Sequence, residues 1–365
     1  MSTCFKIAII TGGTGGHIFP ALALAEALHN KKQYCLILAD ERFLHYKQQF
    51  PGYLPYKIVP SGNFVGSILR KFITLIKILF GILYSINIYL NFRPNLVIGF
   101  GSYVSVPSVL AAKILGIPII IHEQNAVIGK ANKFLMKFAK IITLTFNHTI
   151  GVELQKHKVE VVGNPVRREI LKYRDLPYRT PDKVISILVT GGSQAAVVFS
   201  KVLPAAIVLL EKSIRERIKL FQQCRIEDSP KVRQKYSELG VDCIIEKFFN
   251  NMPELLSEAH IIISRAGASI ISELIAIGRP AIFVPIHHSI GNHQYLNAKI
   301  LKDNGAAWLI NEPEFTAENC ANLLSELIKN PDRLSSAASN ARMLYNNSSD
   351  RLVDIIINFC RYGHI

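Results

Sequence analysis

Two segments of this chain share one pattern of apolar and polar positions. In each, an apolar run of strand length (5–10 and 184–189) enters a Thr-Gly-Gly turn, and a helical pattern follows at 21–28 and 194–212. An apolar run that ends in a glycine turn before a helix is typical of a buried parallel strand. The pattern therefore predicts an α/β chain with two similar, doubly wound parallel-sheet domains of the Rossmann-like kind, facing each other across a cleft.

Further strands and helices alternate along both halves. We expect strands at 34–40, 95–99, 117–121, 140–145, 158–162, 217–221, 242–245, 261–264 and 280–285, and helices at 104–115, from 129 onward and from 316 to the end. Gly163, Pro165 and the polar tract 172–183 indicate a domain boundary. We expect an N-terminal domain at 1–164 and a C-terminal domain at 165–345, with residues 346–365 forming a helix that packs back on the first domain.

Residues 67–90 form the most hydrophobic stretch of the chain. Its polar or small positions, Arg70, Thr74, Lys77, Gly81 and Ser85, recur every three or four residues and make one narrow stripe on a helix. A buried helix, a membrane span and a helix with one face in the core and another against lipid all fit this pattern. Lys77 lies inside the stretch and βα units continue on both sides, which disfavours a span.

We favour the two-faced helix, lying at the surface of an acidic membrane leaflet. The residues expected near the membrane are Arg70, Lys71, Ile73, Ile76, Lys77 and Phe80, with Lys137 and Lys140 on a second basic surface.

Composition narrows the partners. The chain has 365 residues, 49% of them hydrophobic and 19% charged, with 42 Lys and Arg against 27 Asp and Glu, a net charge of +15. This excess suggests an anionic partner: nucleic acid, a phosphorylated substrate or an acidic membrane surface. Nucleic acid is the weakest of the three, because no basic motif with interleaved aromatic residues is present. The six cysteines show neither CxxC pairs nor metal-ligand spacing, and no hydrophobic leader precedes the first strand, so we expect a cytoplasmic location.

The glycine stretch Thr11-Gly12-Gly13-Thr14-Gly15-Gly16-His17 is the first candidate site. Its glycines let the backbone approach a ligand, and the helix behind them favours negative charge, so it suits a phosphate or diphosphate. His17 adds a group that can move a proton. A tight turn that binds nothing remains an alternative. So does a dinucleotide fold in which Asp40 binds a ribose, although the glycine spacing does not fit G-x-G-x-x-G.

Other polar groups follow later strands. His122-Glu123-Gln124-Asn125 ends one strand, where open α/β sheets bind ligands, although Asn125 could instead cap the helix near Gly129. After Ser264, a glycine turn leads into a helix whose first N–H groups, 268–270, suit a diphosphate, and Glu273 suits the two hydroxyls of a ribose. His287, His288 and His293 lie close in sequence, but no Cys, Asp or Glu joins them, so a polar loop is favoured over a metal site.

These motifs, taken in order, resemble the MurG family of peptidoglycan glycosyltransferases, within glycosyltransferase family 28. The matching stretches are Gly12 to His17, Gly99 to Tyr103, His122 to Asn125, Gly163 to Arg167, Gly191 to Gln194, Ala266 to Glu273 and Gln294 to Asn297. The resemblance implies a GT-B fold, with UDP-N-acetylglucosamine held mainly by the C-terminal domain and lipid I by the N-terminal one. It implies inverting transfer that yields lipid II and UDP, at the cytoplasmic face of the inner membrane.

The resemblance also assigns roles to positions. Thr14, Gly15, Gly16 and Asn125 are expected beside the transferred sugar, with His17 as the candidate acid or base. The donor nucleotide is expected to contact Arg167, Ser193, the backbone at Phe249, Ala268, Ser269, Ile270, Ile271, Ser272, Glu273 and Gln294. No Asp-x-Asp is present, so we expect no metal and no other cofactor.

The chain departs from the family pattern at Ser102, Ala195, Ile270 and His293, and the extra bulk at Ala195 and Ile270 would narrow the diphosphate site. Two alternatives stay open: a UDP-sugar transferase with a different acceptor, and a membrane-bound scaffold without catalysis. Other cell-wall and division enzymes are possible partners.

Overall fold

The computed structural model describes residues 4–62, 67–153, 158–192 and 197–363. The chain divides into two compact units, unit 1 (Met1–Arg167 with Asn346–Ile365) and unit 2 (Arg168–Tyr345). Each unit is built on one parallel sheet, which confirms the expected fold class of two doubly wound domains. The sequence had placed the boundary three residues earlier, after residue 164.

Unit 1 contains a seven-stranded sheet in the order β3-β2-β1-β4-β5-β6-β7. Its elements are β1 (Lys6–Ile10), α1 (Gly15–Asn30), β2 (Tyr34–Ala39), the 3-10 helix η1 (Glu41–Gln49), β3 (Tyr56–Ile58), α2 (Ile68–Phe92), β4 (Leu96–Gly99), α3 (Ser105–Ile114), β5 (Ile119–Glu123), α4 (Lys130–Leu135), η2 (Met136–Phe138), β6 (Ile141–Leu144), β7 (Val159–Val161) and α14 (Ser348–Tyr362). The chain builds outward from β1 in one direction and resumes at β4 in the other. The turns after β1 and β4 therefore lie at the switch point, where such sheets bind ligands.

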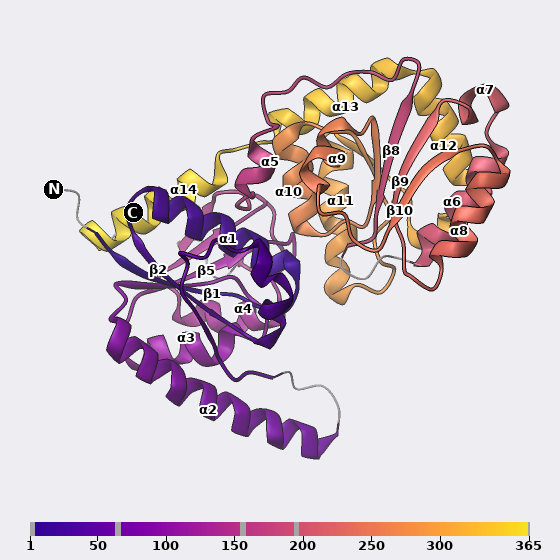
Figure 1. Cartoon of the computed structure of the whole chain (residues 1–365). Helices are drawn as coiled ribbons and strands as arrows, with labels where there is room; N and C mark the ends of the chain where they lie inside the picture. The colour runs from indigo at the N-terminus through magenta and orange to yellow at the C-terminus, as the bar shows by residue number, and fades with distance from the viewer. Residues whose placement is uncertain (1–3, 63–66, 154–157, 193–196, 364–365) are drawn as a thin grey trace. The chain divides into compact units, whose positions relative to one another are not determined.

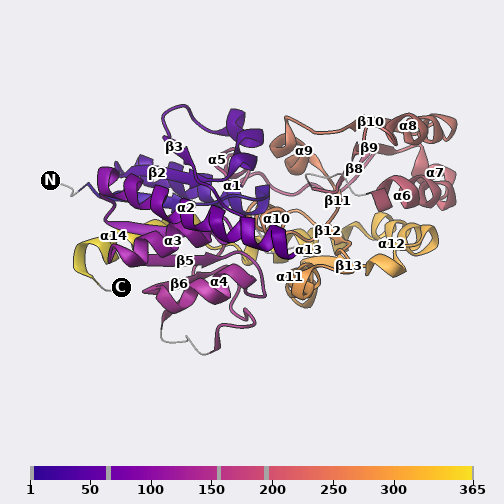
Figure 2. The ribbon, with the colours of Figure 1, turned by 90° about the horizontal axis from the view of Figure 1, so that it is seen from below.

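Helices cover both faces of this sheet. On one face α1 packs with the returning helix α14, where Leu352, Val353 and Ile356 are buried in the core that α1 shares. On the other face α3 and α2 lie side by side, and Ile88 and Tyr89 near the end of α2 are buried in the same core as strand residues (Figures 1 and 2). The strand residues are apolar on both sides because both faces are covered.

Unit 2 has a six-stranded sheet in the order β10-β9-β8-β11-β12-β13. Its elements are α5 (Arg168–Leu171), β8 (Ile185–Thr190), α6 (Val197–Leu209), α7 (Lys212–Arg215), β9 (Ile218–Gln223), α8 (Ser229–Glu238), β10 (Asp242–Glu246), α9 (Met252–Glu258), β11 (Ile261–Ser264), α10 (Ala268–Ile277), β12 (Ala281–Phe283), η4 (Ile290–Asn292), α11 (His293–Asp303), β13 (Ala307–Leu309), η5 (Glu312–Glu314), α12 (Ala317–Lys329) and α13 (Pro331–Met343). The switch point lies between β8 and β11, so the turn that enters α10 again lies there.

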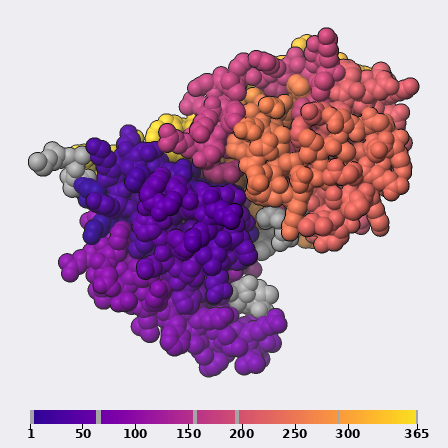
Figure 3. Space-filling view, in the orientation of Figure 1, coloured from indigo at the N-terminus to yellow at the C-terminus, as the bar shows by residue number. Residues whose placement is uncertain are grey.

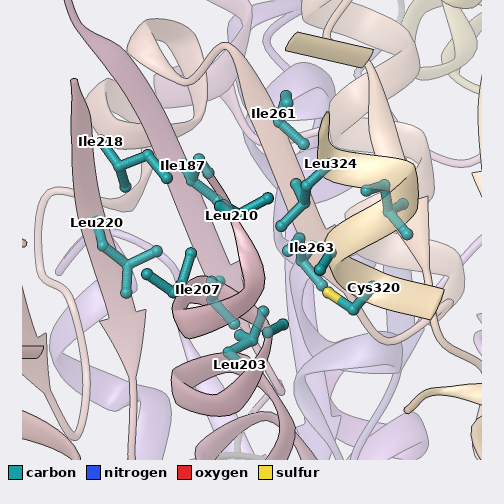
Figure 4. Close-up of a cluster of buried hydrophobic side chains, with 14 of the residues drawn as sticks. Ile187, Leu203, Ile207, Leu210, Ile218, Leu220, Ile261, Ile263, Cys320 and Leu324 are labelled. Atoms are coloured by element: carbon teal, nitrogen blue, oxygen red, sulfur yellow. The ribbon is translucent and has the colours of Figure 1, made fainter. Parts of the chain in front are cut away.

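The core of unit 2 fixes the strand register at this switch point. Ile187, Ile261 and Ile263 point from β8 and β11 toward α6 and α12, where they meet Leu203 and Leu324 (Figure 4). Ser264 pairs with Thr190, so the turns after β8 and β11 leave the sheet at the same level.

Candidate functional site

The glycine turn of unit 1 leads directly into the N-terminus of α1. Thr14 is the N-cap residue and makes no side-chain capping bond, and the first turn of α1 has no acidic residue. Gly13 has φ +86, and a Cβ there would lie 3.0 Å from Ser102 Oγ. The helix start therefore keeps its positive partial charge without a carboxylate of its own, which suits an anionic ligand.

Asp40, which directly follows β2, already binds two groups within the protein. Its Oδ1 accepts the N–H of Gly13 at 3.1 Å, and its Oδ2 pairs with Arg42 Nε at 2.6 Å. Asp40 is 8% exposed, and Arg42 lies over the ring of Tyr103. The carboxylate that a dinucleotide fold would offer to a ribose is used here to hold the glycine turn, so that alternative is wrong.

His17 lies in the first turn of α1 with its ring oriented by two acceptors. Its Nδ1 lies 2.9 Å from the carbonyl oxygen of Phe100 and 3.1 Å from Gln124 Oε1. The amide of Gln124 is itself oriented, because its Nε2 donates to the same carbonyl at 2.8 Å. Both neighbours of Nδ1 accept, so Nδ1 carries the proton and Nε2 carries the lone pair of the neutral ring. In the neutral ring, Nε2 is the nitrogen that can accept a proton.

Glu123, which the sequence analysis named only as part of the polar cluster 122–125, accepts four hydrogen bonds. Its Oε1 accepts from the N–H and the side-chain amide of Asn125 at 3.0 and 3.2 Å. Its Oε2 accepts from the N–H of Gly129 at 2.9 Å and from Asn132 Nδ2 at 2.8 Å. The start of α4 is therefore bound by Glu123, and the alternative that Asn125 caps it is wrong. Glu123 instead fixes the position of Asn125.

His122 is buried and has structural partners. Its ring nitrogens lie 3.0 Å from Thr143 Oγ1 and 3.2 Å from Asn164 Oδ1. Burial lowers the pKa of His122 to about 4, so the ring is neutral at physiological pH. This side chain joins β5 and β6 to the segment after β7, and the nearby His17 adds to the lowering of its pKa.

In unit 2 the N-terminus of α10 forms the second site. Its N-cap Gly267 supplies no side chain, no acidic residue lies in the first turn, and no atom of the described residues lies within 4 Å of where a Cβ on Gly267 would be. Ser269 and Ile270 are half-buried at the first turn. Backbone N–H groups at such an open helix end suit a diphosphate.

The other sequence-predicted residues of unit 2 differ in their freedom to bind. Ile271 is fully buried and its N–H donates to Gly267, while Ser272 Oγ donates to the carbonyl of Ala268. Glu273 is 6% exposed on the next turn of α10. Ile271 and Ser272 thus have partners within α10, and the donor contacts expected at residues 268–273 stay predictions.

Three residues outside α10 were also expected to contact the donor nucleotide: Phe249, Gln294 and Arg167. Phe249 is buried, so only its backbone suits a ligand, and Gln294 Oε1 accepts the N–H of Ile286 at 3.1 Å. Arg167 belongs to unit 1, where its guanidinium lies 4.4 Å above the ring of Phe19 on α1. Ser193 lies outside the described residues.

The helix α2 turns its small residues inward. Thr74, Gly81 and Ser85 are buried, and a Cβ on Gly81 would lie 2.2 Å from the carbonyl oxygen of Pro60. Ser85 Oγ lies 2.9 Å from Ser108 Oγ on α3. The predicted stripe is therefore divided: Gly81 and Ser85 face α3 and Thr74 lies against Gly62, while Arg70 and Lys77 are exposed.

The opposite face of α2 is apolar and exposed. It comprises Ile68, Leu69, Phe72, Ile73, Leu75, Ile76, Leu79, Phe80, Leu83, Tyr84 and Leu90. The purple surface at the lower edge of the space-filling view contains the α2 segment that carries them (Figure 3). The fully buried alternative for this helix is wrong. By its length and apolar composition alone, α2 could cross a membrane.

Among the described residues, no three His, Cys, Asp or Glu side chains come together as a group that could hold a metal ion. The three histidines at 287, 288 and 293 form no such group, and the rings of His287 and His288 lie 4.2 Å apart.

Comparison with known proteins gives matches over nearly the whole chain. The glycosyltransferase family 28 N-terminal domain matches residues 7–143, and the C-terminal domain of the same family matches residues 186–354. A relative from Rhodospirillum centenum is 37% identical over 98% of this chain and 95% of its own length. One from Paramagnetospirillum magneticum is 39% identical over 96% of each chain.

Both relatives are named UDP-N-acetylglucosamine–N-acetylmuramyl-(pentapeptide) pyrophosphoryl-undecaprenol N-acetylglucosamine transferase. Among solved structures, the crystal structure of MurG from Acinetobacter baumannii has a TM-score of 0.76 and 31% identity, covering 96% of this chain and 99% of that one.

Proposed function

This chain belongs to glycosyltransferase family 28, and we propose that it transfers N-acetylglucosamine from UDP-N-acetylglucosamine to lipid I, forming lipid II and UDP in peptidoglycan synthesis. The resemblance of its motifs to the MurG family is confirmed, and the chain is a glycosyltransferase of the GT-B fold class. The observation that carries the proposed reaction is identity of 37–39% over at least 96% of the chain with transferases named for it.

On the donor side, we assign the diphosphate of UDP-N-acetylglucosamine to the N-terminus of α10. The backbone amides of residues 268–270 and the helix dipole would stabilise the negative charge that develops on the leaving UDP. Glu273 would accept from the ribose hydroxyls, and Gln294 and the backbone at Phe249 would contact the nucleotide. We propose that this transfer needs no metal, because the N–H groups at the start of α10 already place positive partial charge where the leaving group forms.

On the acceptor side, we assign the reacting groups to the glycine turn of unit 1. An inverting transfer needs a base at the attacking hydroxyl. His17 is the candidate, because its Nδ1 donates to fixed acceptors and leaves the lone pair on Nε2. Thr14, Gly15, Gly16 and Asn125 would lie beside the transferred sugar, with Asn125 fixed by Glu123.

We propose that unit 1 attaches to the anionic cytoplasmic leaflet of the inner membrane, as a peripheral protein. The exposed apolar face of α2 supplies the hydrophobic contact, and Arg70, Lys71, Lys77, Lys137 and Lys140 are all exposed. By sequence, unit 1 has 20 Lys and Arg and 8 Asp and Glu, so 20 − 8 = 12 of the net charge of +15 belongs to it. Charge and apolar surface therefore occur in the same unit.

The test is UDP release from UDP-N-acetylglucosamine with a lipid I analogue in the presence of EDTA. The unsubstituted protein should turn over, and His17→Ala and Glu273→Ala should each lose most activity. The His17 variant should retain UDP affinity, while the Glu273 variant should lose it. Donor binding without turnover on any acceptor would refute the proposed reaction and favour a scaffold, and activity that EDTA abolishes would refute metal independence.

A further inference from the structure

Glu312 connects the ends of three neighbouring strands of unit 2. It lies in η5, immediately after β13, and its Oε1 pairs with Arg265 Nη2 at 2.5 Å after β11. Its Oε2 accepts the N–H of His287 at 2.9 Å, in the loop after β12. Since β11, β12 and β13 are adjacent in the sheet, one carboxylate joins the three turns at their carboxyl ends.

The partner of Glu312 is an arginine with little access to water. The Arg265 side chain is 11% exposed, donates Nη1 to the carbonyl of Val284 at 3.0 Å, and lies 5.4 Å from the ring of Phe199. Its Nε is buried and has no hydrogen-bond partner among the described residues. Such a charge is tolerated only beside an opposite charge, so its position depends on Glu312.

Both turns that Glu312 joins lead to proposed donor contacts. Arg265 lies two residues before Gly267, the N-cap of α10, whose amides would bind the diphosphate. The loop after β12 contains Ile286, whose N–H donates to Gln294 Oε1 at 3.1 Å. A shift of either turn would therefore change the distance between the α10 amides and Gln294.

Glu312 is ionised at neutral pH. Burial acts to raise the pKa of Glu312, but the hydrogen bonds from Arg265 and from the His287 N–H outweigh it and lower the pKa. The negative charge that holds Arg265 is thus present under working conditions.

We propose that Glu312 is a positioning residue for the donor diphosphate: through Arg265 and the His287 N–H it sets the α10 N-terminus and the Gln294 loop at the spacing that UDP requires. This inference rests on the proposed function. Glu312 touches neither sugar nor phosphate in this scheme, and it acts before the acceptor binds.

The experiment measures UDP binding by calorimetry, with no acceptor present, for Glu312→Gln and for the control Glu314→Gln. Glu314 lies in the same short helix and is exposed, and its carboxylate accepts only from Asn311 Nδ2 among the hydrogen bonds of the described residues. We expect Glu312→Gln to weaken UDP binding about 10-fold, within the usual coupling of residues in one polar network. Glu314→Gln should bind UDP as the unsubstituted protein does, and Glu312→Asp should recover part of the loss.

Steady-state kinetics separate positioning from general damage. The KM for UDP-N-acetylglucosamine should rise by the same factor, with the KM for the lipid I analogue nearly unchanged. The melting temperature of Glu312→Gln should fall, because the buried Arg265 loses its opposite charge, and Glu312→Asp should restore part of it. Unchanged UDP binding in Glu312→Gln would overturn the inference, as would a loss of acceptor affinity and stability that Glu312→Asp does not relieve. If the unsubstituted protein binds UDP but transfers no sugar, the proposed function fails while the binding comparison still decides the role of Glu312. If the unsubstituted protein does not bind UDP, both the proposed function and the role of Glu312 are refuted.

Discussion

The exposed face of α2 permits a quantitative test of membrane attachment. Leu79 and Leu83 lie one helical turn apart and are 53% and 64% exposed. Burying a whole leucine side chain contributes about 1.5–3 kcal/mol, so inserting the exposed part of each contributes about 1–2 kcal/mol. Replacing both with glutamine should therefore weaken membrane partitioning by about 2–4 kcal/mol, or roughly 30- to 700-fold.

The assay is co-sedimentation with vesicles of phosphatidylethanolamine and phosphatidylglycerol across a range of lipid concentrations. Because both side chains are exposed, folding stability should change by no more than about 0.5 kcal/mol per substitution. Leu209→Gln on α6 is the matched control, since Leu209 is also 53% exposed on a helix but belongs to unit 2.

The reasoning fails if the double variant of α2 sediments with vesicles as strongly as the unsubstituted protein. It also fails if Leu209→Gln weakens sedimentation to the same degree, because the loss would then reflect general hydrophobicity and not the face of α2. Full binding to vesicles of phosphatidylethanolamine alone would show that the positive charge of unit 1 has no part in attachment.

Three further predictions follow from single residues. His17→Gln should lower kcat by about 10²–10⁴ with little change in UDP affinity, and a kcat near that of the unsubstituted protein would exclude His17 as the base. Burial lowers the pKa of His122 from 6.5 to about 4, so as the pH falls the unfolded chain takes up a proton on this ring before the folded chain does. The free energy of unfolding should therefore be highest above pH 6.5 and fall by about 3 kcal/mol toward pH 4. Urea titrations at pH 7 and pH 4 should show a smaller loss of unfolding free energy in His122→Gln than in the unsubstituted protein. An equal loss in the two proteins would show that His122 is not the group responsible. Gly81→Ala should lower the free energy of unfolding by more than about 2 kcal/mol, because its Cβ would meet the Pro60 carbonyl at 2.2 Å and Pro107 Cβ at 2.9 Å. Gly52→Ala, where nothing lies within 4 Å, is the control, and equal melting temperatures for the two variants would refute the packing argument.

The sequence by itself determined the architecture and the places where ligands would bind. Apolar runs of strand length, each closed by a glycine turn before a helix, are local features, and they predict parallel strands wherever they recur. The turns before α1 and α10 were identified in this way, because an uncapped helix start after a glycine requires only neighbouring residues. The many apolar residues at 67–90 likewise indicated a helix whose apolar surface is wider than one protein core can cover.

Only the tertiary structure decided which side chains meet. Asp40 binds the Gly13 amide, and His17 is oriented by Gln124, a residue 107 positions away, because strand order brings β1, β2, β4 and β5 together. Glu123, and not Asn125, binds the start of α4, since a carboxylate with two oxygens can serve two turns at once.

The orientation of α2 was decided in the same way. Periodicity shows that a helix has two different faces, but it cannot show which one packs inward. Close approach to α3 requires small residues, so Gly81 and Ser85 face α3 and the large apolar side chains are left outside. Long-range partners of this kind follow from strand order and steric fit, which no local pattern contains.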